Sequence, residues 1–205
     1  MAIAFNQTSF LISAAKEKQF VVDSGAEAAF VGRSNAGKSS ALNTLTNNHK
    51  LARISKTPGR TRLINFFAVG DAEERYRLVD LPGYGYAKVP MAERQAWNEL
   101  INHYLHSRQS LKGLVLLSDI RHSFKPSDWQ IIEWTCAVNC PLHILLTKAD
   151  KLSRNAANKM MRQARKLLDQ QGWQHISTQL FSATKRQGVD ILQDKLSNWL
   201  GLSDD

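Results

Sequence analysis

The chain has 205 residues, of which 43% are hydrophobic, and it carries a formal net charge of +9 at pH 7 with a pI of about 9.7. This length and apolar content predict one globular domain, residues 25–205, with residues 1–24 as a polar lead packed on it. Because the apolar stretches are only strand-sized and the N-terminus lacks a signal-peptide pattern, we expect a soluble cytoplasmic protein with no membrane span. We also expect a monomer. Two cysteines, Cys136 and Cys140, with no second pair argue against a zinc site and a disulfide, and leave packing as their role.

Strand-like apolar runs alternate with amphipathic helical segments along most of the chain. The expected strands are residues 28–31, 63–69, 76–81, 114–119, 142–147 and 176–181. The expected helices are residues 40–45, 91–105, 127–137, 155–171 and 189–200. This alternation predicts an α/β fold with a doubly wound, six-stranded, mostly parallel sheet and helices on both faces. The short linker 70–75 predicts an antiparallel hairpin, which places one antiparallel strand at an edge of the sheet.

The most informative motif follows the first expected strand and matches G-x-x-x-x-G-K-[ST] at every fixed position. Its residues are Gly32, Arg33, Ser34, Asn35, Ala36, Gly37, Lys38 and Ser39. Backbone N–H groups in such a turn, together with the positive end of the following helix, form a cradle for phosphate. Lys38 would reach the outer phosphates, and the Ser39 hydroxyl would hold Mg²⁺. A glycine turn before an ordinary N-capping serine is the alternative interpretation.

If this loop binds phosphates, an acidic strand end should approach the metal from the neighbouring strand. The sequence Asp80, Leu81, Pro82, Gly83 supplies it. In P-loop NTPases such an aspartate holds Mg²⁺, in many of them through water, and the glycine N–H senses the terminal phosphate. We therefore predict these two roles for Asp80 and Gly83.

A base-reading segment is expected at the carboxyl end of a later strand, where Thr147, Lys148, Ala149 and Asp150 stand. An aspartate accepts two hydrogen bonds from the N1–H and exocyclic amine of guanine, and adenine presents neither donor in that geometry. The sequence therefore predicts GTP rather than ATP, with the aliphatic stem of Lys148 along the ring face. A further loop can offer backbone N–H groups to the guanine oxygen; it consists of Phe181, Ser182 and Ala183.

These motifs, in this order and spacing, resemble those of the EngB (YihA/YsxC) family of bacterial ribosome-biogenesis GTP-binding proteins. The matching segments are GRSNAGKS at 32–39, SKTPGRT at 55–61, DLPGYGYA at 80–87, TKAD at 147–150 and FSA at 181–183. The resemblance covers nearly the whole chain. It implies the three-layer fold of Ras-like P-loop GTPases, GTP or GDP with Mg²⁺, association with the assembling large ribosomal subunit, and a requirement in growth and septation.

The resemblance also implies residue roles. Ser39 and Thr61 would be the protein ligands to Mg²⁺, with Thr61 in a switch segment ordered by the terminal phosphate. Thr57 is the rival for that role, and the GRT triplet favours Thr61. The nucleotide contacts of this switch would come from Gly59, Arg60, Thr61, Arg62 and Leu63. Thr147 stands where many GTPases have asparagine, so we expect a less rigid base-reading loop with guanine specificity retained.

Hydrolysis is expected to be slow. Ras-like enzymes orient the attacking water with a glutamine after the switch glycine, and Tyr84 stands there instead, where a phenol lacks the amide's donor and acceptor pair. The groups expected to act in hydrolysis are Lys38, Thr61, Gly83 and Asn35. Asn35 lies where the TrmE and Era class uses an asparagine to bind K⁺, so a monovalent cation is a further expected cofactor.

Positive charge is gathered in two runs that favour an RNA partner, since a cationic surface releases counterions from a polyanion. The runs are Lys50, Arg53, Lys56, Arg60 and Arg62, and Lys151, Arg154, Lys159, Arg162, Arg165 and Lys166. A solvated face is the alternative for either run. Two other function classes stay open: an ATP-dependent P-loop enzyme, and a partner module in cell division with negligible hydrolysis.

Overall fold

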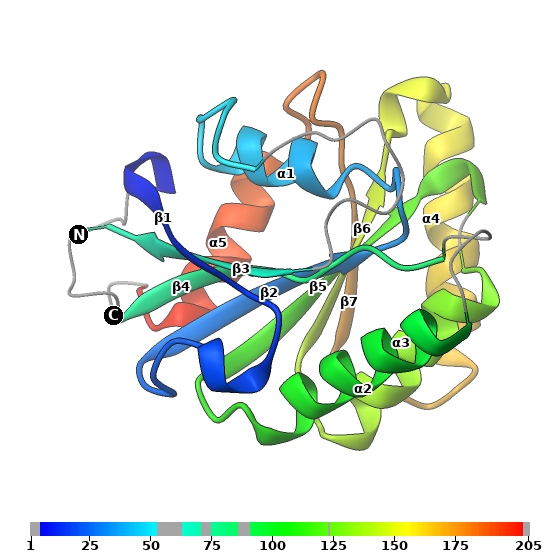
Figure 1. The fold of residues 1–205 in the computed structure, drawn as a ribbon. Coiled ribbons are helices and arrows are strands. Elements are labelled where there is room, and N and C mark those ends of the chain that lie inside the picture. Colours follow the sequence, from blue (N-terminus) through cyan, green and yellow to red (C-terminus); the bar gives the residue numbers. More distant parts are fainter. Residues whose placement is uncertain (1–4, 53–62, 71–74, 86–90, 123, 203–205) are drawn as a thin grey trace.

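A computed structural model describes residues 5–52, 63–70, 75–85, 91–122 and 124–202 of the chain. In this part, seven strands form one sheet in the order β1-β3-β4-β2-β5-β6-β7 (Figure 1). The strands are β1 (Thr8–Ala14), β2 (Ala26–Gly32), β3 (Ile64–Val69), β4 (Tyr76–Asp80), β5 (Leu111–Asp119), β6 (Leu142–Thr147) and β7 (Ile176–Leu180). The helices are α1 (Lys38–Leu45), α2 (Met91–Ser107), α3 (Pro126–Ala137), α4 (Arg154–Asp169) and α5 (Val189–Leu200).

The predicted hairpin is present, because β3 and β4 pair antiparallel. The predicted mostly parallel α/β sheet is confirmed, but it has seven strands instead of six and its antiparallel strand β3 does not lie at an edge. The N-terminal strand β1 pairs antiparallel with the outer side of β3, so β3 lies one place inside the edge. Every other neighbouring pair is parallel.

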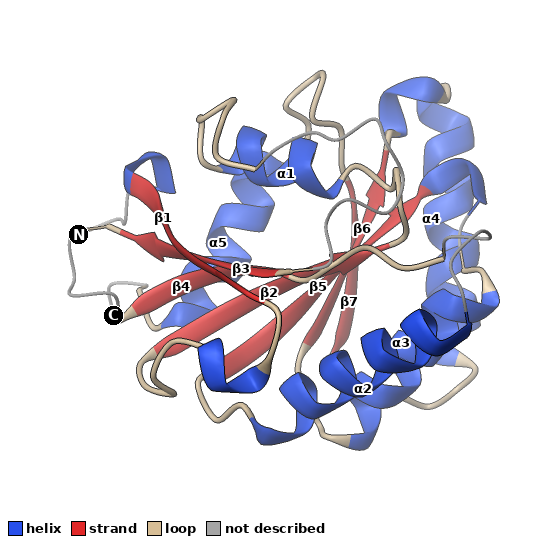
Figure 2. Cartoon of the chain, in the orientation of Figure 1, coloured by secondary structure: helices blue, strands red, loops and turns tan. Residues whose placement is uncertain are grey.

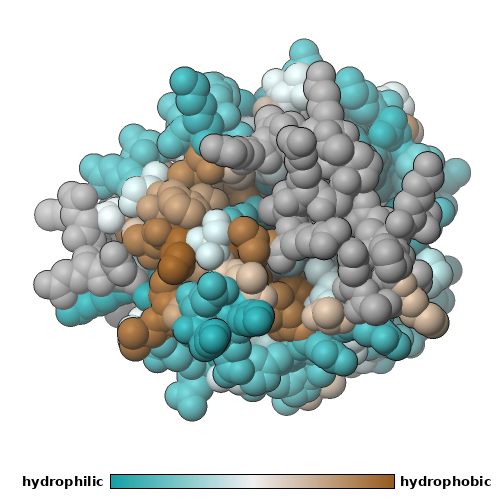
Figure 3. All heavy atoms as spheres, in the orientation of Figure 1, coloured by the Kyte–Doolittle hydropathy of each residue, from teal (hydrophilic) through white to brown (hydrophobic). Residues whose placement is uncertain are grey.

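The sequence pattern does not predict strand β1, and the structure shows why. Its register shifts between Phe10 and Ile12, so the alternation of inward and outward residues breaks there. Phe10 and Ile12 stay 55% and 39% exposed, and apolar side chains gather on this face of the molecule (Figure 3). Exposed apolar residues mixed with serines give no clear strand signal.

Helices cover both faces of the sheet, which makes three layers (Figure 2). Alternate residues of β2 enter opposite cores: Ala29 and Val31 face α2, α3 and α4, whereas Ala28 and Phe30 face α1 and α5. Both cysteines are free and half-buried against the first of these cores, as expected for packing residues. None of the helices in the described ranges has the length and apolar character needed to cross a bilayer.

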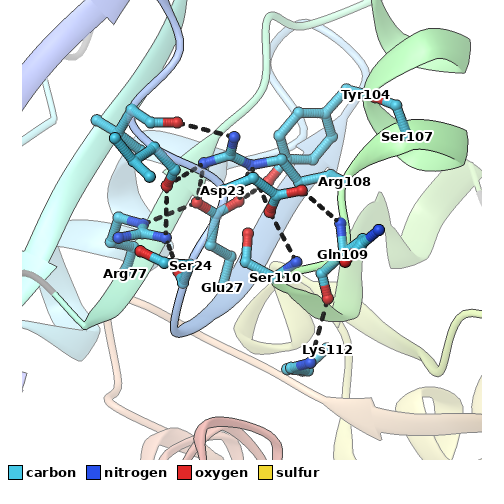
Figure 4. A network of polar contacts seen from close by, with 12 residues as sticks. Asp23, Ser24, Glu27, Arg77, Tyr104, Ser107, Arg108, Gln109, Ser110 and Lys112 are labelled. Atoms are coloured by element: carbon cyan, nitrogen blue, oxygen red, sulfur yellow. Dashed lines mark hydrogen bonds and ion pairs between the residues drawn. The ribbon is translucent and has the colours of Figure 1, made fainter.

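A buried ionic network closes the amino end of the sheet (Figure 4). The Glu27 carboxylate is fully buried and accepts hydrogen bonds from Arg77 Nε at 2.7 Å, Arg108 Nη2 at 2.6 Å and Tyr104 Oη at 2.8 Å. These contacts join β2 to β4 and to the end of α2. A buried carboxylate needs such partners, because removing one leaves an uncompensated charge.

The carboxyl ends of the parallel strands lie at the opposite end of the sheet from this network. There β2 ends at Gly32, β4 at Asp80, β5 at Asp119 and β6 at Thr147. In open α/β sheets, ligands bind outside the carboxyl ends of the strands. The sequence motifs therefore lie at the carboxyl ends of the strands, where ligands bind in this architecture.

Candidate nucleotide-binding site

The phosphate loop connects β2 to α1, and its shape depends on two glycines. A Cβ on Gly32 would lie 2.9 Å from the carbonyl oxygen of Leu117, so only glycine fits between the strands. Gly37 is the N-cap of α1 with φ +97°, in the region that disfavours side chains. Because Gly37 provides no side-chain cap, the first-turn N–H groups of α1 stay available to an anion.

Lys38 and Asp80 meet at the start of α1. The Lys38 ammonium contacts the Asp80 carboxylate, and both side chains are nearly buried. Asp80 ends β4 opposite Asn65, whose Nδ2 lies 3.4 Å from Asp80 Oδ2. Ser39 follows in the same helical turn and is half-buried. The Ser39 hydroxyl and the Asp80 carboxylate are oxygen donors of the kind that Mg²⁺ prefers.

The structure brings the segment from Leu81 to Tyr84 against the phosphate loop. Ser34 N–H donates to the carbonyl oxygen of Tyr84 at 2.9 Å, and Tyr84 N–H donates to that of Gly32 at 3.3 Å. Gly83 lies between these contacts, and a Cβ there would come 3.4 Å from the Gly32 oxygen. The Tyr84 side chain points away from the phosphate loop and enters the core between α2 and α3.

Two side chains hold the base-reading segment to the phosphate loop. Thr147 Oγ1 donates to the carbonyl oxygen of Ala36 at 2.6 Å, and Lys148 Nζ donates to that of Asn35 at 2.8 Å. Lys148 has φ 58°, which turns the chain sharply after β6. The hydroxyl of Thr147 itself makes this connection, and the lower loop rigidity expected from threonine at this position stays a prediction.

Asp150 lies at the far end of this segment with its carboxylate held by the next loop. Ser182 Oγ donates to Asp150 Oδ1 at 2.6 Å and accepts from Lys185 N–H at 3.1 Å. The hydrogen bond from Ser182 lowers the pKa of Asp150 below its ordinary value, so the carboxylate is ionised at neutral pH. Ala149 N–H also donates to the carbonyl oxygen of Phe181 at 3.1 Å. Ala183 follows, half-buried.

Several predicted residues lie outside the described part of the chain: Thr57, Gly59, Arg60, Thr61 and Arg62. Leu63 is described and is 36% exposed just before β3. The Arg33 side chain lies close to Gly85 with its Nε buried, and Asn35 is exposed in the loop with φ 63°. The other candidate residues lie together at the carboxyl ends of the strands. They belong to the phosphate loop, the Asp80 segment and the base-reading segment.

Sequence reasoning missed Asp119 at the end of β5. Its carboxylate pairs with Lys148 Nζ at 3.0 Å and with Arg121 Nη2 at 2.7 Å. Burial raises the pKa of Asp119, but hydrogen bonds from Arg121 and Lys148 outweigh burial and hold that pKa well below its usual range. The sequence did carry a signal for Asp119, because it is an acidic residue at the end of an apolar run.

Solved structures share the fold of this chain. A crystal structure described as a probable GTP-binding protein EngB aligns over 87% of this chain and 100% of its own, with a TM-score of 0.70 and 19% identity. A point variant of Aquifex aeolicus Era bound to GDP·AlF4⁻ aligns over 89% of this chain and 58% of its own, with a TM-score of 0.66 and 22% identity. The likeness places the chain in the fold class of P-loop GTPases, and the phosphate loop lies where that fold requires it.

Sequence comparisons narrow the class. The 50S ribosome-binding GTPase family model matches residues 27–148. A probable GTP-binding protein EngB of Coxiella burnetii, strain RSA 331, is 52% identical over 198 residues, which are 97% of this chain and 95% of the relative. The chain belongs to the EngB family of GTP-binding proteins.

Proposed function

We propose that this protein is a GTP-controlled switch that acts in the cytoplasm in assembly of the large ribosomal subunit. GTP would order the segments around Thr61 and after Gly83, and that state would expose a surface for ribosomal RNA. Slow hydrolysis would then release the subunit. A requirement in cell division and septation would follow from the supply of ribosomes. Membership in a ribosome-binding GTPase family supports this proposal.

The observation that carries the nucleotide assignment is the placement of Asp150. Its ionised carboxylate is fixed by Ser182, while Thr147 and Lys148 bind the same segment to the phosphate loop. A base contacted by Asp150 and a phosphate chain held by Lys38 therefore belong to one continuous site. An oriented carboxylate accepts from guanine and finds no matching donor pair on adenine. This disfavours the alternative of an ATP-dependent enzyme.

Ser39, Thr61 and, through water, Asp80 are the residues that we propose for Mg²⁺. The ion would neutralise charge on the outer phosphates. Lys38 would exchange its contact with Asp80 for the phosphates, and Gly83 N–H would sense the terminal one. These assignments rest on the donor set described above and on the family's motifs.

The buried phenol of Tyr84 supports slow turnover. Its hydroxyl is directed to α3, so it cannot orient a water at the phosphates. We propose that K⁺ beside Asn35 supplies part of the missing charge stabilisation. Hydrolysis in K⁺ should then exceed hydrolysis in Na⁺, and Asn35→Gly, which tolerates φ 63°, should remove the difference. Equal rates in both salts would contradict the K⁺ proposal.

Helix α4 is the surface that we propose for RNA. Residues 151–168 contain six cationic side chains and no acidic one. Arg154, Lys159, Arg162 and Lys166 are exposed along the helix. A cation in the first turn opposes the helix dipole, so Arg154 gives the helix no electrostatic benefit and is better explained by an anionic partner. Of the first cationic run, only Lys50 lies within the described residues.

Isothermal titration tests the nucleotide assignment. Wild-type protein should bind GTP and GDP and should bind ATP at least ~100-fold more weakly, since the guanine donors that Asp150 accepts are missing from adenine. Asp150→Asn should shift preference towards xanthine nucleotides, because the amide replaces one acceptor with a donor. Asp169→Asn, an exposed carboxylate at the end of α4, is the matched control and should leave the preference unchanged. Equal affinity for ATP and GTP would contradict the assignment of a guanine nucleotide as the ligand.

A further inference from the structure

Tyr84 is anchored in the protein interior. Its side chain is 5% exposed, and its hydroxyl donates to Asp128 Oδ1 at 2.6 Å in the first turn of α3. Burial and then the neighbouring Asp128 carboxylate raise the pKa of Tyr84 well above its ordinary value. The phenol therefore stays protonated and remains the donor in this hydrogen bond.

Asp128 is itself fully buried and is held on its other side. Its Oδ2 accepts from Lys125 N–H at 2.9 Å, just before α3 begins. Both oxygens of the carboxylate thus have backbone or phenol donors. A buried acceptor that lost the Tyr84 hydroxyl would keep its desolvation penalty without the compensating bond.

Helix α2 holds the same short segment from a third side. The Trp97 ring lies 5.5 Å from the Tyr84 ring, and Trp97 Nε1 donates to the carbonyl oxygen of Pro82 at 3.1 Å. The Tyr84 backbone is meanwhile hydrogen-bonded to Gly32 and Ser34. Gly83 stands between Pro82 and Tyr84, so both of its neighbours in the chain are fixed.

We infer that Tyr84 and Asp128 form a positioning pair that holds Gly83 N–H against the phosphate loop, so that selection of triphosphate over diphosphate depends on a hydroxyl directed to α3. This inference rests on the proposed role of Gly83 as the sensor of the terminal phosphate. Lys38 and Asp150 would bind triphosphate and diphosphate alike. Losing the Tyr84 hydroxyl should therefore affect only the nucleotide that reaches Gly83.

The test compares dissociation constants for GDP and for a non-hydrolysable GTP analogue. Tyr84→Phe should weaken the analogue about tenfold, the equivalent of one hydrogen bond to a charged acceptor, and should leave GDP within about twofold. Asp128→Ala should have the same effect. The double variant should be no weaker than either single variant, since residues that act through one contact are not additive.

Two variants serve as controls. Tyr104→Phe removes another buried phenol that donates to a buried carboxylate, at 2.8 Å to Glu27 at the opposite end of the sheet. It should lower thermal stability and leave the GDP-to-analogue ratio unchanged. Asp128→Asn can accept from Lys125 N–H and donate to the Tyr84 oxygen, so its ratio should stay within about threefold of wild type.

An unchanged ratio in Tyr84→Phe, or an equal loss for both nucleotides, would overturn the inference. Additive losses in the double variant would also overturn it. Failure of the proposed function would look different, because the wild-type protein would then bind neither guanine nucleotide.

Discussion

Thr147 Oγ1 donates a hydrogen bond to the carbonyl oxygen of Ala36 at 2.6 Å and thereby joins the end of β6 to the middle of the phosphate loop, 111 residues earlier in the chain. Thr147 is buried. Thr147 is thus the buried one of two side chains that join the base-reading segment to the phosphate loop; the other is Lys148, which donates to the carbonyl oxygen of Asn35.

Thr147→Val should weaken GDP binding about tenfold, because it leaves the Ala36 carbonyl without its donor at a cost of about 1–2 kcal/mol. Isothermal titration measures the change. Thr135→Val is the matched control: Thr135 Oγ1 donates to the Ile131 carbonyl at 2.6 Å, is equally buried, and lies in α3 away from the loop. An equal loss of affinity in both variants would show a general effect of removing a buried hydroxyl.

If the cationic face of α4 binds RNA, the affinity for large subunits should depend on the salt concentration through this helix. A Lys159→Gln, Arg162→Gln, Lys166→Gln triple variant should sediment less with purified large subunits in the presence of a GTP analogue. The slope of log affinity against log salt should fall by about 0.7–0.9 for each phosphate that the helix no longer neutralises. GDP should weaken binding of the wild-type protein.

The control for α4 removes the same charge at the other end of the molecule. Lys16, Lys18 and Lys112 are exposed near the amino end of the sheet, and their replacement by glutamine should leave sedimentation unchanged. If both triple variants lost affinity to the same extent, net charge rather than α4 would account for association.

His143 predicts a loss of stability in mild acid. Burial lowers the pKa of His143 to about 4, and the ring is bonded to Ser177 Oγ at 2.7 Å and Gln179 Oε1 at 2.8 Å. The folded pKa lies below the unfolded value of about 6.5, so the unfolded chain binds the extra proton between these values. The free energy of unfolding should therefore fall by roughly 3 kcal/mol from this residue as pH drops from about 6.5 to about 4.

Urea unfolding across this pH range measures the effect. His143→Gln should flatten the dependence, whereas His106→Gln, an exposed histidine on α2, should preserve it. A His143→Gln variant with the wild-type slope would assign the acid sensitivity to other groups.

The parts of the site that the sequence predicts are those determined locally. A loop from Gly32 to Ser39 needs only its glycines and the following helix to present N–H groups, and its motif states both. The strands β2 and β6 are buried along their whole length and β5 is buried from Gly113 to Ser118, so each contains a mostly apolar run. Asp150 could be placed because it follows such a run.

The parts that escaped prediction depend on distant partners. Tyr84 lies beside the switch glycine in sequence, but its side-chain direction is set by Asp128 on α3, 44 residues later. Strand β1 is recognisable only through its pairing with β3, because its own residues are half-exposed and interrupted by a bulge. Roles given to Thr61 and its neighbours stay predictions.

Strand β1 has a consequence for how the molecule meets others. By pairing with β3 it moves the outermost row of peptide groups onto a strand whose hydrogen-bonding register is broken between Phe10 and Ile12. An irregular border is a poor template for a further strand, and natural sheets use such breaks to prevent stacking into fibres. Recruitment of a further strand is thus discouraged along β1, at this one of the two edges of the sheet.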